Sequence, residues 1–124
     1  MILADTSVWV DHLAGRNREL VALLDAGVVL THPFVIGELA LGELRQRVLV
    51  LDALLNLPRA AVATETEVLH FIERQRLFGR GIGYVDVHLL AAVRLTPGAA
   101  LWTHDRRLHG AAEQLGLAMS HRKS

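Results

Sequence analysis

Hydrophobic and polar positions follow two different periods along the chain. Short apolar runs that end at polar or turn residues predict strands, and apolar residues spaced three and four apart predict helices. The predicted strands comprise residues 1–5, 28–32, 59–63, 99–104 and 117–119. The predicted helices comprise residues 6–15, 17–27, 32–44, 46–56, 64–78, 84–95 and 105–116.

Strands that are separated by helices form parallel sheets through right-handed crossovers, with helices on both faces. We therefore predict a three-layer α/β/α fold with a central parallel sheet of four to five strands. A chain of 124 residues with 52% hydrophobic residues is suited to one compact domain. This single domain is expected to span 1–124, with 120–124 as a loose tail.

Polar residues at the helix boundaries support this division of the chain. Ser7 is a possible N-cap of the first helix, and Asn17 is a suitable N-cap of the second. Pro33 fits the first position of the helix that His32 opens, because proline's fixed φ suits that position. Thr64 has a glutamate three residues later, which is the spacing of a capping box.

Two carboxylates stand inside helices that are otherwise largely apolar. Glu38 shares its helix face with Phe34 and Leu41, and Asp86 is surrounded by apolar residues with His88 as the other polar interior residue. Burying an unpaired carboxylate costs several kcal/mol or forces it to take up a proton. Both side chains are therefore expected to point toward water or positive charge.

Two further aspartates follow predicted strands. Asp5 closes the first strand and Asp105 follows the fourth, and the carboxyl ends of parallel strands lie at one edge of a sheet. Each also has a purely structural interpretation. Asp5 or Ser7 can cap the first helix, Asp105 can cap the last, and Asp86 lies in a first turn where the helix dipole favours negative charge.

One arrangement explains all four acidic residues together, namely their convergence at the carboxyl edge of the sheet. Four carboxylates in one cleft repel one another and raise one another's pKa values unless a cation is present. Hard oxygen ligands favour Mg²⁺ or Mn²⁺ over Zn²⁺. The pattern therefore predicts a metal site formed by Asp5, Glu38, Asp86 and Asp105.

The charge and composition of the chain exclude few classes of binding partner. Basic and acidic residues both number 13, so a binding site for a polyanion must be a local patch. The chain has no cysteine, which excludes disulfides and thiolate metal sites and is compatible with a reducing cytoplasm. Its first residues contain no basic segment, and no apolar run approaches the roughly 20 residues that span a bilayer. We expect a soluble cytoplasmic protein that does not enter membranes.

Four patches in this order resemble the PIN-domain ribonucleases, and within them the VapC toxins of bacterial toxin–antitoxin pairs. The patches are ILADTSVWVDHL near the N-terminus, ELA in the third helix, YVDVHLLAA past the middle and LWTHDRRL near the end. The resemblance extends from Met1 to about Met119. A D-T-S triplet alone is weak evidence, but four acidic positions with these neighbours and spacings are specific.

The resemblance implies a Mg²⁺- or Mn²⁺-dependent endoribonuclease that leaves 5′-phosphate and 3′-hydroxyl ends. It makes Asp5, Glu38, Asp86 and Asp105 the catalytic and metal-binding quartet. It also implies three hydroxyls that orient ligands or water, on Thr6, Ser7 and Thr103. A toxin of this kind has a VapB-like antitoxin partner, forms homodimers and contacts DNA only through the antitoxin. Its substrate is a tRNA, rRNA or mRNA.

Positive charge for phosphate binding is expected from Arg106 and Arg107 beside Asp105, and from Arg80 in the glycine-rich loop. A zinc site is disfavoured, because His104 and His109 are five residues apart and neither an H-E-x-x-H motif nor cysteine accompanies them. Two alternatives remain. One is a PIN nuclease of RNA processing without an antitoxin, and the other is a receiver-like phosphoacceptor module. A small overlapping upstream reading frame would favour the toxin.

Overall fold

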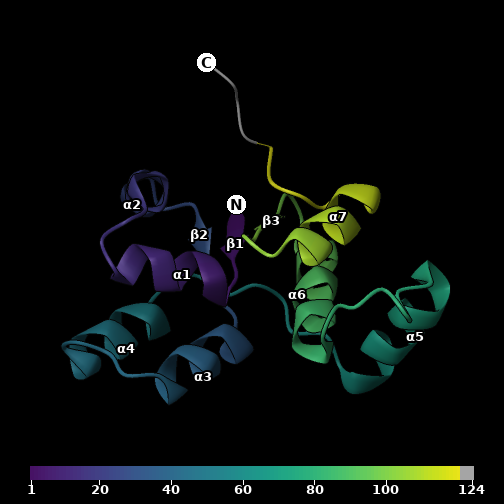
Figure 1. The fold of residues 1–124 in the computed structure, drawn as a ribbon, viewed down its shortest axis with the longest axis horizontal. Coiled ribbons are helices and arrows are strands. Elements are labelled where there is room, and N and C mark those ends of the chain that lie inside the picture. Colours follow the sequence, from purple (N-terminus) through teal and green to yellow (C-terminus); the bar gives the residue numbers. More distant parts are fainter. Residues whose placement is uncertain (121–124) are drawn as a thin grey trace.

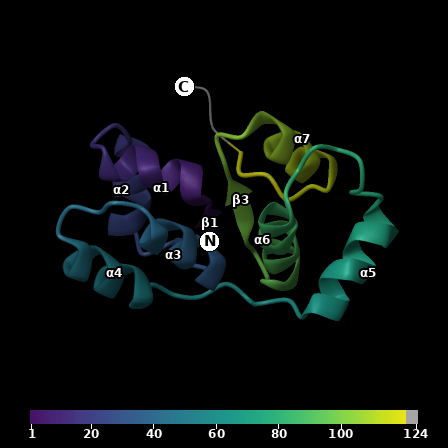
Figure 2. The same cartoon turned by 60° about the horizontal axis from the view of Figure 1, so that its bottom comes forward.

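A computed structural model describes residues 1–120 of the chain. Its elements in chain order are β1 (Ile2–Ala4), α1 (Thr6–Leu13), α2 (Arg18–Asp25), β2 (Val29–Leu30), α3 (Pro33–Leu41), α4 (Arg47–Leu55), α5 (Glu65–Gln75), α6 (Tyr84–Leu95), β3 (Ala100–Trp102) and α7 (Arg106–Gln114). Helices α1 to α4 lie on one side of the strands and helices α5 to α7 on the other (Figures 1 and 2). The predicted α/β architecture with a parallel sheet is confirmed.

The sheet has three strands among the described residues, in the order β2-β1-β3. Both strand pairs are parallel, and Ile2 lies opposite Val29 on one side and opposite Ala100 on the other. The prediction of four to five strands is therefore wrong. The short central strand β1 still places its carboxyl end directly beside that of β3, because Ala4 pairs with Trp102.

Both missing strands approach the sheet but form only one bridge each. Residue Arg59 of the segment 59–63 bridges to Thr31, and the N–H of Ala61 donates to the Thr96 hydroxyl at 2.9 Å. The segment 117–119 bridges to Leu101 through two backbone hydrogen bonds of 2.7 and 2.8 Å. Each bridge nonetheless covers part of an edge that would otherwise expose unpaired backbone groups.

The starts of these helices follow the predicted caps. Asn17 caps α2, His32 and Pro33 open α3, and the capping box at Thr64 opens α5. Helix α1 is capped by Asp5, one of its two predicted candidates, because the Asp5 carboxylate accepts the Val8 N–H at 3.3 Å. Helices α3 and α5 end about three residues earlier than predicted. The part of the predicted tail beyond residue 120 lies outside the described residues.

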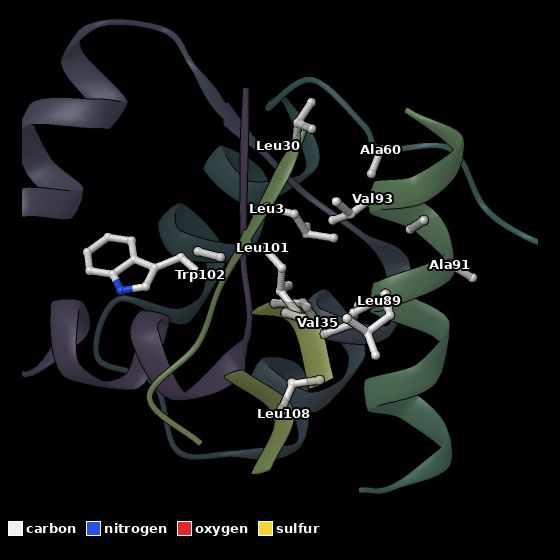
Figure 3. Close-up of a cluster of buried hydrophobic side chains, with 14 of the residues drawn as sticks. Leu3, Leu30, Val35, Ala60, Leu89, Ala91, Val93, Leu101, Trp102 and Leu108 are labelled. Carbon is white, nitrogen blue, oxygen red and sulfur yellow. The ribbon is translucent and has the colours of Figure 1, made fainter. Parts of the chain in front are cut away.

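The core lies on both sides of the sheet. Leu3 and Leu101 point toward α6, whereas Trp102 points to the opposite side (Figure 3). Helix α6 is buried at seven consecutive residues, 87–93. Each fully buried leucine or valine contributes roughly 1.5–3 kcal/mol to the free energy of unfolding. This packing holds the first turn of α6, which carries Asp86, in a fixed position relative to the strands.

Within residues 1–120, none of the helices combines the length and the apolar character that a membrane crossing requires.

Candidate active site

Asp5 lies at the carboxyl end of β1 and is almost completely buried. Its carboxylate accepts hydrogen bonds from the hydroxyls of Ser7 and Thr103, both at 2.5 Å, and from the Val8 N–H. Because Thr103 follows β3, the Asp5 carboxylate joins the ends of two neighbouring strands. Three donors therefore surround this buried carboxylate and fix its orientation.

Backbone N–H groups fix the orientation of both hydroxyls. The His104 N–H donates to the Ser7 oxygen and the Asp105 N–H donates to the Thr103 oxygen, each at 3.0 Å. Each hydroxyl oxygen therefore accepts from the backbone, and its proton points toward Asp5. The predicted role of Ser7 and Thr103 as orienting groups has a specific physical basis in this arrangement.

Asp86 and Asp105 each cap the start of a helix. Asp86 lies in the first turn of α6, and Asp105 is the residue before α7. Asp86 accepts the Gly83 N–H at 3.0 Å, and Asp105 accepts the Leu108 N–H at 2.9 Å. Each of these caps uses one carboxylate oxygen. The second oxygen of Asp86 and of Asp105 makes no hydrogen bond within residues 1–120, so capping leaves one oxygen of each available for a ligand.

Glu38 reaches the same region from α3. Its carboxylate is exposed and accepts the Thr6 hydroxyl at 2.6 Å, which connects α3 to the first residue of α1. The expectation that Glu38 points toward water is thus met. The face of α3 on which it lies is more open than its apolar sequence suggests, because Leu41 on that face is 91% exposed.

The four carboxylates interact electrostatically. Partial burial raises the pKa of Asp86, the Gly83 N–H opposes this, and the charges of Asp105, Asp5 and Glu38 raise the pKa further. Electrostatic interaction thus links Asp86 to each of the other three acidic residues that the sequence singled out. A carboxyl group with a raised pKa beside three like charges is stabilised in its ionised form by a cation.

The donor set fits a hard divalent cation chemically, since it consists of carboxylate oxygens and hydroxyls. Within residues 1–120, no three acidic or histidine side chains are gathered closely enough to form a ready metal site. Each of the four carboxylates instead accepts hydrogen bonds from donors of its own.

The predicted arginines lie around the glycine-rich loop and the start of α7. Arg106 and Arg107 are exposed, and Arg80 donates to the Gln114 side chain at 2.6 Å. The Arg107 side chain lies directly over Gly81, whose φ is +75°. This contact joins the loop before α6 to the start of α7, so it holds a guanidinium between the segments that carry Asp86 and Asp105.

We expect Gly81→Ala to lower the free energy of unfolding by about 1–2 kcal/mol and to displace Arg107. An added Cβ would lie 2.5 Å from the Arg107 Nη1 atom, in a backbone conformation that alanine rarely adopts. Chemical denaturation provides the measurement, and Gly37→Ala is the control. Gly37 lies within α3 with open space around it, so its substitution should stabilise the fold by roughly 0.5–1 kcal/mol. An equally stable Gly81→Ala variant would contradict the proposed strain.

The two histidines considered for zinc have separate acidic partners. His104 lies 3.2 Å from Asp11, and His109 lies 3.5 Å from Glu113 on its own helix. Asp11 also binds Arg16. Sequence inspection did not identify Asp11, because its partner His104 is 93 residues away and only the parallel pairing of β1 with β3 brings them together.

A parallel α/β sheet with acidic residues near its carboxyl edge is an architecture suited to hydrolysis of phosphate esters. Comparison with known proteins identifies the family of proteins to which this architecture belongs. The model of the PIN domain family matches residues 2–114, so the chain belongs to the PIN-domain family. This membership removes the receiver-like alternative. The four sequence patches had suggested the same family, and that prediction is confirmed.

Two curated relatives narrow the class further. Both are named Ribonuclease VapC32, one from Mycobacterium tuberculosis (strain CDC 1551 / Oshkosh) and one from Mycobacterium tuberculosis (strain ATCC 25618 / H37Rv). Each is 50% identical over 120 residues, which cover 97% of this chain and 97% of the relative. The protein is therefore a nuclease of the VapC type within the PIN domain family.

Proposed function

We propose that this protein is an endoribonuclease that depends on Mg²⁺ or Mn²⁺ and hydrolyses RNA to 5′-phosphate and 3′-hydroxyl ends. The observation that best supports the proposal is the electrostatic interaction of Asp86 with Asp105, Asp5 and Glu38 at the carboxyl edge of the sheet. Four mutually repelling carboxylates are costly to a fold unless they serve a cation. The whole activity is proposed to reside in the single domain of residues 1–124.

The acidic quartet would hold the ion. A bound divalent cation would supply a water of lowered pKa and would offset the negative charge of the reacting phosphate. Asp5 is suited to direct binding because its hydroxyl donors fix the orientation of its carboxylate, and Asp86 and Asp105 each have an oxygen without a hydrogen bond in the described residues. Glu38 is exposed and is suited to accept a proton or to act through water.

Three hydroxyls and three arginines complete the proposed site. Ser7 and Thr103 orient the Asp5 carboxylate, and Thr6 orients Glu38. Phosphate groups of the RNA would be bound by the guanidinium groups of Arg106, Arg107 and Arg80, which lie along the start of α7 and the glycine-rich loop. The substrate would be a tRNA, rRNA or mRNA, cut in a single-stranded or looped region.

The relatives' VapC name supports a toxin that a VapB-like antitoxin neutralises. A groove of about 330 Å³ beside the site has Thr6 and Glu38 on its wall, together with the apolar residues Val10, Leu13 and Leu39. An antitoxin tail bound in this groove would cover two site residues while burying apolar surface. In this proposal the toxin is a homodimer and reaches DNA only through the antitoxin. A PIN nuclease of RNA processing would lack this partner.

The test is cleavage of end-labelled total tRNA and rRNA by the purified protein, with Mg²⁺, with Mn²⁺ and with EDTA. We expect discrete cuts with either metal, their abolition by EDTA, and product 5′ ends that are substrates for a 5′-phosphate-dependent exonuclease. Cuts that persist in EDTA would contradict the metal dependence. Products with 5′-hydroxyl ends would contradict the proposed hydrolysis, because they indicate attack by the RNA 2′-hydroxyl.

A further inference from the structure

Two aromatic side chains from different helices meet at His88 on the surface next to the acidic quartet. Phe34 of α3 and Tyr84 of α6 each contact the His88 ring in an edge-to-face arrangement, at centroid distances of 4.7 and 4.6 Å. His88 is only 4% exposed, whereas Phe34 is 37% exposed and Tyr84 is 49% exposed. The buried imidazole thus supports two rings that remain open to solvent.

Both rings are placed by the same helices as two of the acidic residues. Phe34 precedes Glu38 by four residues in α3, and residues four apart lie on one face of a helix. Tyr84 is the first residue of α6 and adjoins Gly83, whose N–H binds Asp86. A strand of RNA whose phosphate lies at the carboxylates would therefore carry its neighbouring bases past these two rings.

The core does not account for the exposed rings. The adjacent residues Val35 and Val87 already fill the interior beneath α3 and α6. Phe34 and Tyr84 instead keep a large part of their surface in solvent, where an apolar ring gains little stabilisation. Paired aromatic side chains on a surface near phosphate-binding groups are typical of proteins that bind single-stranded nucleic acid, because every base has a face that can stack.

We propose that Phe34 and Tyr84 stack against an unpaired base of the RNA adjacent to the cleaved bond. This inference rests on the proposed ribonuclease function and adds a base-binding element to it. The carboxylates and arginines contact the backbone, so they are indifferent to sequence. The two rings give the site a means to select unpaired bases and to prefer purines, which have the larger stacking surface.

Binding of short fluorescein-labelled oligoadenylate and oligouridylate, followed by fluorescence anisotropy with Mg²⁺, tests the inference. An Asp86→Asn background keeps the RNA intact. We expect Phe34→Leu and Tyr84→Ala each to weaken oligoadenylate binding roughly 5- to 100-fold, and oligouridylate binding less. Tyr84→Phe should retain the affinity of the parent, because the ring and not the hydroxyl carries the contact.

Phe78→Ala is the matched control. Phe78 is 59% exposed and lies between α5 and α6, outside the ring cluster, so its loss should leave affinity unchanged. Phe34→Leu keeps an apolar side chain against His88, and circular dichroism verifies the fold of every variant. Affinity equal to the parent in both Phe34→Leu and Tyr84→Ala would overturn the inference and leave the rings as a surface for a protein partner. An equal loss for both oligonucleotides would overturn the base preference.

The two proposals fail in different ways. If the ribonuclease proposal is wrong, the wild-type protein shows no metal-dependent cleavage of tRNA or rRNA. If only the stacking inference is wrong, wild-type cleavage is intact while the ring variants bind both oligonucleotides as tightly as the parent.

Discussion

Replacement of Asp86 by asparagine is expected to lower RNA cleavage by roughly two to four orders of magnitude. The substitution removes one of the four charges that together attract the cation. Asp86 is the member whose pKa is raised by the charges of the other three. The asparagine oxygen can still accept the Gly83 N–H, so the start of α6 is retained. Loss of activity would therefore reflect the site and not the fold.

Asp5→Asn is expected to lose activity to a similar degree, but it also carries a cost in stability. The Ser7 and Thr103 hydroxyls both donate to Asp5, and both already accept a backbone N–H. An asparagine side chain offers one acceptor oxygen, so one hydroxyl would face an amide donor. A buried donor without an acceptor costs about 1–3 kcal/mol, which thermal unfolding would detect.

Cleavage rates of Asp5→Asn and Asp86→Asn, measured beside wild type with saturating Mg²⁺, provide the comparison. Asp25→Asn is the matched control, because Asp25 is exposed at the end of α2, where the helix dipole disfavours a negative charge. Its substitution should leave cleavage unchanged. If Asp86→Asn cleaves at the wild-type rate while folded, the acidic quartet is not the catalytic centre.

Local sequence signals predicted the elements that hold this site. The helix at 84–95 has the predicted bounds, and the capping box at Thr64 forms as expected, because both depend on residues a few positions apart. The extent of the sheet was not predictable in this way. The segment 59–63 forms one bridge to Thr31, and its Ala61 N–H binds the hydroxyl of Thr96, 35 residues away; local sequence does not show such contacts.

Asp5 and Asp105 could be assigned to one edge of the sheet because topology alone places the ends of parallel strands together. The surroundings of the acidic residues could not be assigned in the same way. The hydrogen bond from Thr6 to Glu38 and the contact of Phe34 with His88 depend on how α3 packs against α1 and α6. The exposure of side chains on α3 was also not predictable. Its mostly apolar sequence suggests burial on every face, whereas Leu41 lies in solvent.

His32 combines a structural role with a strongly altered protonation. It is completely buried, and its Nδ1 atom accepts the Phe34 N–H at 3.0 Å as the N-cap of α3. Burial, followed by the nearby His88 and Arg59, lowers the pKa of His32 from 6.5 to about 4. A proton on Nδ1 would also replace the acceptor of the cap with a donor, so the imidazole is neutral in the folded protein.

We expect this histidine to make the protein sensitive to acid. Between pH 6.5 and 4 the unfolded chain binds a proton at His32 that the folded chain does not, so stability falls as the pH falls through this range. The contribution is fully present above pH 6.5 and amounts to at most about 3.5 kcal/mol, since each pKa unit corresponds to about 1.4 kcal/mol. Urea unfolding at a series of pH values between 4 and 7.5 measures it.

His32→Asn isolates the effect, because asparagine is a good N-cap that does not titrate. The variant should lose packing at neutral pH, but its free energy of unfolding should fall less steeply with acid than that of wild type. His109→Asn is the control for the loss of an imidazole, since it removes a partly exposed histidine on α7 that lies outside the core. If wild type and His32→Asn lose stability in parallel between pH 6.5 and 4, the neutral buried imidazole is not the source of the acid sensitivity.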